Sequence, residues 1–390
     1  MSPDGSSSFD RFLALRARRT VRWLGLMSGT SCDGIDSAIV DLSECDDGIP
    51  MAKLIAGEVR PFATSFSAEL SRDLDGRGSA RTTAESAARW DRRLGEAFAS
   101  AAQEAMAKHG PVDAIALSGH TFAHHPEVGA TLQVGSPSIV AAATETPVVG
   151  AFRTSDVAHG GEGAPLVPAG DRVWFASDDG PVAVLNLGGI GNLTWLPDRR
   201  GMPSARDTGP SNLVLDLVVR EATGEPFDQD GRRARTGEPH GAWIDRWNEH
   251  PFFSSSRRTT GREEFGRGWV EAHRAELETL SLEDRLATLA GWVASNVVRV
   301  LGEWIAPGDA RLLVGGGGAR NEAILAALLA HGIEQLEVLD RERHGVGGDL
   351  REAAAFAVLG HEFLHQRPAA FPTTTGCRAP GPIGALWIPR

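Results

Sequence analysis

The stretch GLMSGTSCDGIDSAIVDL, residues 25–42, carries small hydroxyl residues, glycines and acids directly after an apolar run. Residues 22–27 and 36–42 are typical of two strands, so the polar residues fall in the turn between them. Glycine, serine and aspartate are common in ordinary turns for conformational reasons alone. Here they follow one another between positions 28 and 36, where they offer donors to a phosphate and carboxylates to Mg²⁺. The stretch therefore predicts a phosphate-binding turn in an α/β protein.

A second stretch, VAVLNLGGIGNLTWL at residues 182–196, has the same plan of a strand, a small-residue turn and another strand. Apolar runs alternate with amphipathic stretches over the rest of the chain. They predict strands at 22–27, 36–42, 53–60, 113–118, 147–152, 182–189, 192–196, 311–314 and 335–339, and helices at about 83–108, 212–223, 282–305, 319–331 and 349–365. The pattern predicts two related α/β lobes with a ligand cleft between them.

Composition limits the class of protein and its partners. The chain has 390 residues, of which 51 are acidic and 39 basic, and the net charge of −12 argues against nonspecific nucleic-acid binding. Its three cysteines lack paired spacing and suit a reducing compartment. The apolar run behind the basic residues 16–22 ends at Ser28, too early for a signal peptide, and no transmembrane run follows. We expect a cytoplasmic protein with a disordered leader at 1–20 and no nucleic-acid or membrane partner, and we leave a homodimer open.

Residues 312–325, LLVGGGGARNEAIL, predict a strand, four glycines and the start of a helix. A flexible turn is the simplest interpretation, but the carboxyl ends of strands are where α/β sheets bind ligands. The run does not continue into the Rossmann fingerprint. A Walker loop is excluded as well, because no lysine lies near the turn at 28–36 and the sequence Gly-Lys-Ser/Thr is absent. The glycine run is therefore predicted to contact a nucleotide.

Two polar segments carry further candidate residues. Asp207, within ARDTGPSNLVLD at 205–216, is predicted in a polar turn before a helix, where it is either a capping acid or a functional one. An aspartic protease would need a second facing aspartate, which only a symmetric dimer supplies. The glycine-rich loop at 152–170 is either a linker or, through Arg153 and Asp156, a substrate-holding loop at a domain junction.

Histidines suggest metal sites that the sequence context does not support. HEFLH at 361–365 matches the zinc-peptidase motif formally, but residues 366–390 contain no Asp, Glu or His as a third ligand. We therefore expect these side chains to be solvated at the end of a helix. His120, His124 and His125 have no carboxylate or cysteine beside them in the sequence, and we interpret them as loop or substrate-contact residues.

Nine motifs in order along the chain resemble the anhydro-N-acetylmuramic acid kinase family, of the sugar-kinase, heat-shock-chaperone and actin superfamily. The resemblance covers about residues 22–388. The motifs are GLMSGTSCDGID, TLQVGSPSIVA, FRTSDVAHGGEGAPLVPA, LNLGGIGN, DTGPSNLVLD, FDQDG, TTGREEF, GGGGARN and REAAAFAVLG.

This resemblance implies two ribonuclease-H-like lobes with an ATP cleft between them, lobe I at 21–150 plus 367–390 and lobe II at 151–366. It implies an ATP-dependent kinase that opens the 1,6-anhydro ring of anhydro-N-acetylmuramic acid with water and phosphorylates O6. The products are N-acetylmuramic acid 6-phosphate and ADP, in peptidoglycan recycling.

Site residues follow from the same resemblance. Asp207 matches the carboxylate base that activates the attacking water. Arg153, Asp156 and Asn212 match residues that approach the sugar, and Asp33 matches the acid near Mg²⁺, directly or through water. The nucleotide is implied to contact Ser28, Gly29, Thr30, Ser31, Cys32, Asp33, Gly34, Ile35, Gly189, Asn192, Gly315, Gly316, Gly317, Gly318 and Glu352.

Three departures from the family pattern concern the sugar side. Residues 117–121 read Leu-Ser-Gly-His-Thr where the family has Ser-His-Gly-Gln-Thr, Gly170 and Asp171 stand where it has Phe-His, and Ser211 stands where it has glycine. The Asp207 turn is retained. The sequence therefore leaves two alternatives open, a related kinase for another anhydro-sugar and an ATP-gated binding protein without sugar chemistry.

Overall fold

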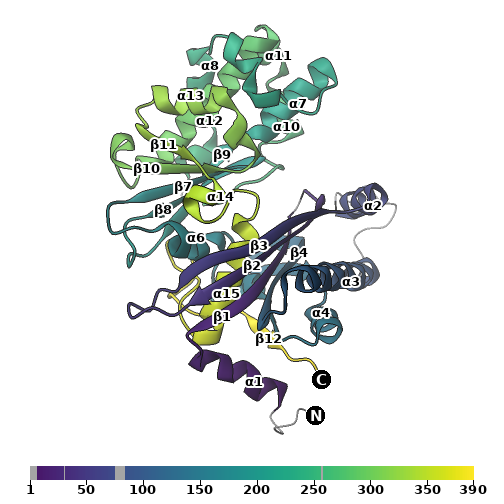
Figure 1. Cartoon of the computed structure of the whole chain (residues 1–390). Coiled ribbons are helices and arrows are strands. Elements are labelled where there is room, and N and C mark those ends of the chain that lie inside the picture. The colour runs from purple at the N-terminus through teal and green to yellow at the C-terminus, as the bar shows by residue number, and fades with distance from the viewer. Residues whose placement is uncertain (1–6, 30, 75–83, 256–257) are drawn as a thin grey trace. The chain divides into compact units, whose positions relative to one another are not determined.

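The computed structural model describes residues 7–29, 31–74, 84–255 and 258–390. The chain folds into two compact units, each drawn in Figure 1. Unit 1 consists of Met1–Trp174 and Arg341–Arg390, and unit 2 of Phe175–Asp340. The predicted fold class, α/β with two lobes, is confirmed. The units divide at 174 and 340, whereas the sequence places the boundaries near 150 and 367. The helix at 351–365 packs on the first sheet, and the helix at 167–175 touches that helix at Gly170.

Unit 1 is built on a sheet whose first three strands are antiparallel and whose next strands are parallel to β1. Its order is β12 (Ala385–Trp387), β6 (Val148–Gly150), β4 (Ala114–His125), β1 (Thr20–Ser28), β2 (Gly34–Ser43) and β3 (Met51–Pro61), and β5 (Ala130–Val134) pairs with β4. The helices are α1 (Ser8–Ala14), α2 (Thr64–Leu74), α3 (Ala84–His109), α4 (Pro137–Thr144), α5 (Phe152–Ala158), α6 (Val167–Phe175), α14 (Arg341–His344) and α15 (Arg351–His365).

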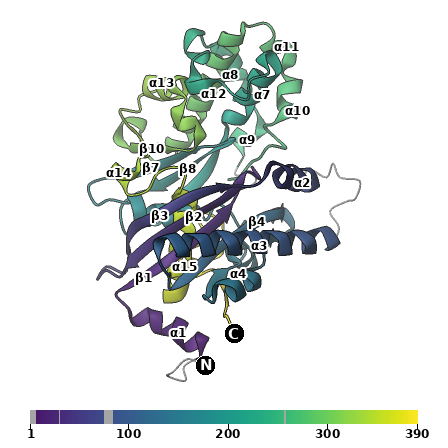
Figure 2. The same cartoon turned by 45° about the vertical axis from the view of Figure 1, so that its right-hand side comes forward.

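Alternate residues of β1 face different helices, as a strand with period two requires. Leu24 and Leu26 join the core formed with α3, whereas Trp23 and Gly25 face α15. A Cβ on Gly25 would lie 1.9 Å from the carbonyl O of Ala353, so only glycine allows this helix to pack so closely. Figure 2 shows α3 in front of the strands and α15 behind them. The sheet is therefore buried on both faces, which explains the nearly continuous apolar run in β1.

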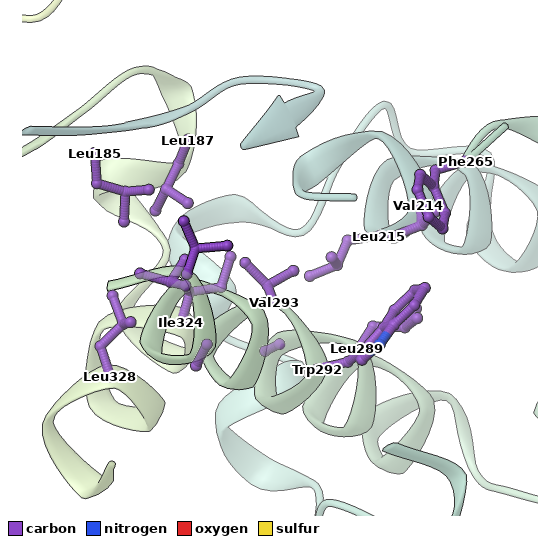
Figure 3. Packing of buried hydrophobic residues seen from close by; sticks show 14 of the residues in the cluster. Leu185, Leu187, Val214, Leu215, Phe265, Leu289, Trp292, Val293, Ile324 and Leu328 are labelled. Carbon is purple, nitrogen blue, oxygen red and sulfur yellow. The ribbon is translucent and has the colours of Figure 1, made fainter. Parts of the chain in front are cut away.

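Unit 2 repeats this topology in the order β11 (Gln335–Val338), β10 (Arg311–Gly315), β7 (Val182–Leu187), β8 (Ile190–Leu196) and β9 (Ser204–Pro210). Its α-helices are α7 (Asn212–Thr223), α8 (Gly241–Trp247), α9 (Pro251–Ser254), α10 (Arg267–Ala272), α11 (Arg274–Leu277), α12 (Leu282–Leu301) and α13 (Glu322–Ala330). The helix α12 is central to the core, and Figure 3 shows its Leu289, Trp292 and Val293 beside Leu215 and Ile324. The predicted ribonuclease-H-like order, three antiparallel strands followed by two parallel ones, occurs in both units.

Three local features differ from the sequence-based expectation. The expected loop at 152–170 contains α5 and the start of α6, so only its middle is a loop. Residues 204–210 form β9, so Asp207 lies within a strand and not in a turn. Residues 8–14 form α1, which a capping box between Ser7 and Asp10 starts and which buries Phe12, although the sequence predicts a disordered leader there. Among the described residues, no helix combines the length and the hydropathy that crossing a membrane requires.

Candidate functional site

The turn between β1 and β2 holds the first group of predicted nucleotide residues. Ser28 ends β1 and is buried, whereas Ser31 and Asp33 are exposed. Ser31 Oγ donates a 2.7 Å hydrogen bond to Asp33 Oδ1, and the amide of Cys32 donates one of 3.1 Å to the carbonyl O of Gly29. A closed turn therefore presents the Ser31 hydroxyl and the Asp33 carboxylate to solvent, hydrogen-bonded to each other.

Two other members of the predicted turn, Gly34 and Ile35, belong to β2. Gly34 starts β2, where a Cβ would lie 2.3 Å from the carbonyl O of Arg60, so strand packing requires glycine. Ile35 is 1% exposed and belongs to the core. Gly34 and Ile35 are therefore explained by packing within unit 1, whether or not the turn binds a ligand. Thr30 lies outside the described residues.

Four carboxylates lie near this turn, those of Asp33, Asp36, Asp349 and Glu352. Burial, followed by the negative charges of the other three, raises the pKa of Asp36 to about 7. A divalent cation relieves repulsion of this kind. Among the described residues, no three of these carboxylates bring oxygens within 4.8 Å of one another, so they do not form a preformed metal-ligand group.

Glu352 lies in the first turn of α15 and is partly buried, whereas the sequence alone suggests a helix-surface acid. Burial raises the pKa of this carboxyl, although the charges of Arg351 and Arg153 oppose the effect. Arg153 Nη1 donates a 2.9 Å hydrogen bond to the carbonyl O of Gly163, while its buried Nε has no partner among the described residues. An unsatisfied buried donor in a native structure points to a missing water or ligand.

Asp156, predicted to approach the sugar, has its carboxylate occupied by the chain. The side chain is fully buried, Oδ2 accepts a 2.7 Å hydrogen bond from the amide of Gly163, and Oδ1 accepts one of 2.7 Å from Thr375 Oγ1. Asp156 lies on α5, as Arg153 does, and holds Gly163 of the following loop, whose carbonyl O accepts from Arg153. A direct sugar contact does not fit its burial.

The family departure at Gly170 and Asp171 is explained by packing in unit 1. A Cβ on Gly170 would lie 2.4 Å from the Cβ of Ala355, so α6 and α15 touch at this glycine. Asp171, fully buried, forms a bidentate pair with Arg351, whose Nε lies 2.6 Å from Oδ1. These residues position the start of α15, where Glu352 lies, and neither faces solvent.

In unit 2 the predicted residues line up across the sheet. Gly315 of β10 pairs with Asn186 of β7, Asn186 pairs with Asn192 of β8, and Asn192 pairs with Asp207 of β9. Directly opposed residues of neighbouring strands share a face of the sheet. Three strand spacings of about 4.8 Å separate the ends of this row by roughly 14 Å. One transverse row therefore joins the glycine run to the predicted base.

The glycine run folds tightly against the end of β7. Gly316 has φ +82°, and a Cβ there would lie 2.6 Å from Asn186 Oδ1. A Cβ on Gly318 would lie 2.8 Å from Nδ2 of Asn212, and that amide donates a 2.9 Å hydrogen bond to the carbonyl O of Leu187. Glycine is thus required by the close approach of β7 and α7. Asn212, predicted on the sugar side, lies beside the glycine run.

The exposed Gly189 lies in the turn between β7 and β8. Its carbonyl O accepts hydrogen bonds from the amides of Ser211 and Leu213, at 3.1 and 3.2 Å. These bonds satisfy amides at the start of α7, so this helix end is closed by the turn rather than open to an anion.

A pocket of about 240 Å³ opens beside the glycine run within unit 2. Its lining is Asn212, Leu215, Asp216, Phe227, Asp228, Gln229, Asp230, Gly317, Arg320 and Asn321. Phe227 is 47% exposed, and burial raises the pKa of Asp216 to about 6. The pocket thus combines an exposed ring, an apolar floor and carboxylates.

Asp207 is held by residues 258–264, which follow α9 in the chain. Its Oδ2 accepts a 2.8 Å hydrogen bond from the amide of Thr260, and its own amide donates one of 2.8 Å to the carbonyl O of Arg258. Thr260 Oγ1 donates a 2.6 Å hydrogen bond to Glu264 Oε2. The motif TTGREEF therefore orients the predicted base.

The HEFLH segment differs from the expectation of solvated side chains. His361 is fully buried and its Nε2 lies 2.7 Å from Oε1 of Glu44, while His365 Nε2 lies 3.6 Å from the same oxygen. A potential third ligand thus comes from Glu44, far upstream of the motif, and not from residues 366–390. Arg367 pairs with both Glu44 and Glu362, so these carboxylates are already neutralised.

Two residues near the site, Asn186 and Asp216, had no predicted role. They are polar positions inside otherwise apolar elements, a signal that sequence patterns contain. His120, interpreted above as a loop or substrate-contact residue without a cysteine beside it in the sequence, lies on β4, 3.9 Å from the Sγ of Cys32. A contact between residues 88 positions apart is not visible in spacing.

Known proteins are similar to this chain over almost its whole length. The profile of a family described as Anhydro-N-acetylmuramic acid kinase matches residues 21–389. A relative of that name from Salinibacter ruber is 38% identical, covering 97% of this chain and 99% of the relative. Another from Acidithiobacillus ferrooxidans is 40% identical, covering 94% and 92%.

Among solved structures, the activator of the 2-hydroxyisocaproyl-CoA dehydratase from Clostridium difficile, with bound ADPNP, is similar at 14% identity and a TM-score of 0.42, covering 88% of this chain and 96% of that one. The family match spans both units and every candidate residue described above. The chain belongs to the anhydro-N-acetylmuramic acid kinase family.

Proposed function

We propose that this protein is an ATP-dependent kinase that opens the 1,6-anhydro ring of anhydro-N-acetylmuramic acid and phosphorylates O6. The sugar, water and ATP give N-acetylmuramic acid 6-phosphate and ADP, a step of peptidoglycan recycling. The observation that carries the proposal is the row Gly315, Asn186, Asn192 and Asp207, in which a nucleotide-type glycine turn and a carboxylate share one face of a sheet.

Asp207 is the general base of this reaction. Water must attack the anomeric carbon as O6 leaves toward the γ-phosphorus, so a carboxylate has to orient the water and take its proton. The amide of Thr260 fixes the direction of the Asp207 carboxylate, and Glu264 fixes Thr260 through its hydroxyl. A base held by its neighbours in this way needs little reorganisation on substrate binding.

The nucleotide binds to the glycine run and to the pocket beside it. Phe227 and Leu215 offer apolar contacts for the base, while Asp216 is suited to accept hydrogen bonds from ribose hydroxyls. The amides after Gly315 and the turn from Ser28 to Asp33 supply donors for the phosphates. Phosphoryl transfer depends mainly on positioning and charge neutralisation, so a lysine is not required.

The carboxylates around Asp33 and Asp36 hold Mg²⁺ in this proposal. When bound, the ion neutralises charge on the phosphates. Glu352 adds a further carboxylate to the group, and Arg153 supplies an unused donor near it. We assign Arg153 to an anionic group of the substrate, held in place by the loop that Asp156 shapes.

Product analysis tests the proposal. Purified protein with Mg-ATP and anhydro-N-acetylmuramic acid should release ADP only when the sugar is present, and the product should contain one added water and one added phosphoryl group. Turnover with a different anhydro-sugar alone would favour the related kinase. ATP binding without any sugar-dependent ADP release, across a panel of anhydro-sugars, would favour the ATP-gated binding protein.

A further inference from the structure

A buried histidine lies directly under the turn that we assign to ATP phosphates. His120 is on β4, is 0% exposed, and is paired in parallel register with Ser28 of β1. Its Nδ1 is 3.1 Å from Ser28 Oγ, and its Nε2 is 3.9 Å from Cys32 Sγ. One imidazole thus contacts both the first buried residue of the turn and the residue at its far side.

The position of Ser28 opposite His120 depends on an irregularity in the strand pairing. The register between β1 and β4 shifts after Leu26, so Ser28 meets His120 rather than Gly119. Ser28 is 6% exposed, which leaves its hydroxyl few directions in which to point. A hydrogen bond to the ring therefore sets the orientation of this hydroxyl.

The conformation of Cys32 shows why the turn needs support from below. Its φ of +57° lies in the left-handed region, which costs a residue other than glycine about 1–2 kcal/mol. Ser67 Oγ donates a hydrogen bond to the carbonyl O of Cys32, and His120 lies against its sulfur. Two side chains from distant parts of unit 1 thus hold one strained residue.

The imidazole is suited to this role because it stays neutral. Burial lowers the pKa of His120 to about 4, so one ring nitrogen accepts a hydrogen bond and the other donates one at neutral pH. Since the ring is fully buried, it cannot touch substrate. A single histidine and a single cysteine also supply too few ligands for a metal ion.

We propose that His120 is a positioning residue that orients the Ser28 hydroxyl, and thereby the turn at 28–33, for the phosphates of ATP. The inference rests on the proposed function only in assigning that turn to ATP. Part of the ATP affinity then depends on a residue that the nucleotide never contacts. It also gives a structural role to one position of the departing segment 117–121.

Three substitutions of His120 separate its two contacts. His120→Asn keeps a polar group near the position of Nδ1 and hence the contact with Ser28, whereas His120→Gln keeps one near Nε2 and the contact with Cys32. His120→Phe keeps a ring and removes both. We expect the Asn variant to retain the wild-type KM and Kd for ATP, and the Gln and Phe variants to raise both roughly tenfold, the usual effect of one hydrogen bond. The KM for the sugar should stay unchanged in all three.

The measurements are ATP binding by calorimetry and steady-state KM values for ATP and for the sugar, with the melting temperature showing that each variant is folded. His331→Phe, an exposed position at the end of α13, is the control. If the Phe variant does not fold, the difference in ATP affinity between the Asn and Gln variants still tests the role of His120.

The two proposals fail in different ways. Wild type that binds ATP but releases no ADP with any anhydro-sugar overturns the kinase assignment, and the ATP affinities still test His120. Equal ATP affinity in wild type and in the Gln variant overturns the role of His120, whatever the sugar kinetics show. A rise in the sugar KM with unchanged ATP affinity would also contradict it.

Discussion

Nε1 of Trp23 donates a 3.2 Å hydrogen bond to Nδ1 of His361, and both side chains are fully buried in unit 1. An indole N–H only donates, so Nδ1 of the neutral imidazole must be the acceptor and Nε2 must carry the proton. That proton points to Glu44 Oε1 at 2.7 Å. The nitrogen that zinc would need is therefore already a hydrogen-bond donor, and the HEFLH motif is a structural network in this fold.

This tautomer predicts that the purified protein carries no stoichiometric zinc and that a chelator leaves its melting temperature unchanged. Replacing His361 by alanine should instead destabilise the protein by about 1–3 kcal/mol, because Trp23 and Glu44 lose a buried partner. Metal analysis and thermal unfolding are the measurements. One zinc per chain, or a chelator-sensitive melting temperature, would contradict the network interpretation.

The buried pair of Asp171 and Arg351 predicts that removing one partner lowers the free energy of unfolding much more than replacing both. Their side chains are 0% and 3% exposed. Asp171→Ala strands a buried guanidinium and should cost about 3–5 kcal/mol, whereas Asp171→Leu combined with Arg351→Met should recover most of that loss. Denaturant unfolding measures both.

Arg92→Ala, which breaks the exposed pair with Glu96, is the control for the buried pair and should cost under about 0.5 kcal/mol. A loss for Asp171→Ala as small as that of this control would show that the buried pair does not stabilise α15.

The pKa of Asp36, raised to about 7, predicts a pH dependence of stability. The unfolded carboxyl titrates near 3.8, so the folded state binds the proton more tightly and stability falls as the pH rises from about 4 to 7. Asp36→Asn should reduce this slope and stabilise the protein above pH 7 by about 1–2 kcal/mol, allowing for solvent screening of a partly exposed group. Asp178→Asn, an exposed position, should change neither.

Melting curves between pH 4 and pH 9 test the Asp36 prediction, with and without Mg²⁺. Added Mg²⁺ at pH 8 should raise the melting temperature of wild type more than that of Asp36→Asn. An unchanged slope in the variant would show that Asp36 is not the group responsible.

The exposed ring of Phe227 predicts a role in nucleotide affinity. Stacking of a base on an aromatic side chain contributes roughly 1–3 kcal/mol, so Phe227→Ala should raise the KM for ATP at least about fivefold with little change in the sugar KM. Phe9→Ala removes a ring that is equally exposed, 49% against 47%, on α1 of unit 1. Equal ATP KM values for the two variants would place the base elsewhere.

The sequence contained most of the fold because its apolar runs are long and its turns are rich in glycine. Each predicted strand and long helix has a counterpart in the structure, whereas β5, β9 and β12 were not predicted. The segment SARDTGP of β9 lacks the apolar alternation of a strand. Its pairing with β8 provides the missing stabilisation. The local sequence therefore predicted a turn at Asp207, which lies in β9. The role of Asp207 as a base was inferred separately, from the family motif.

The site was harder to predict where function and packing share residues. Gly34 and Asp156 lie in motifs that suggest ligand contact, yet each serves a close approach or a buried hydrogen bond of the chain. Conversely, His120 carries no motif of its own and acquires its contacts only when β4 is placed beside β1. Contacts between strands distant in sequence are set by tertiary packing, which residue spacing does not encode.

The central claim is that Asp207 is the base of a sugar-dependent phosphoryl transfer, and coupled ADP release tests it most directly. With Mg-ATP and anhydro-N-acetylmuramic acid, Asp207→Asn should lower kcat at least about 100-fold while ATP affinity and the melting temperature stay near wild type. Asp245→Asn, an exposed aspartate of unit 2, should keep full activity. Sugar-dependent ADP release by folded Asp207→Asn at the wild-type rate would contradict the account.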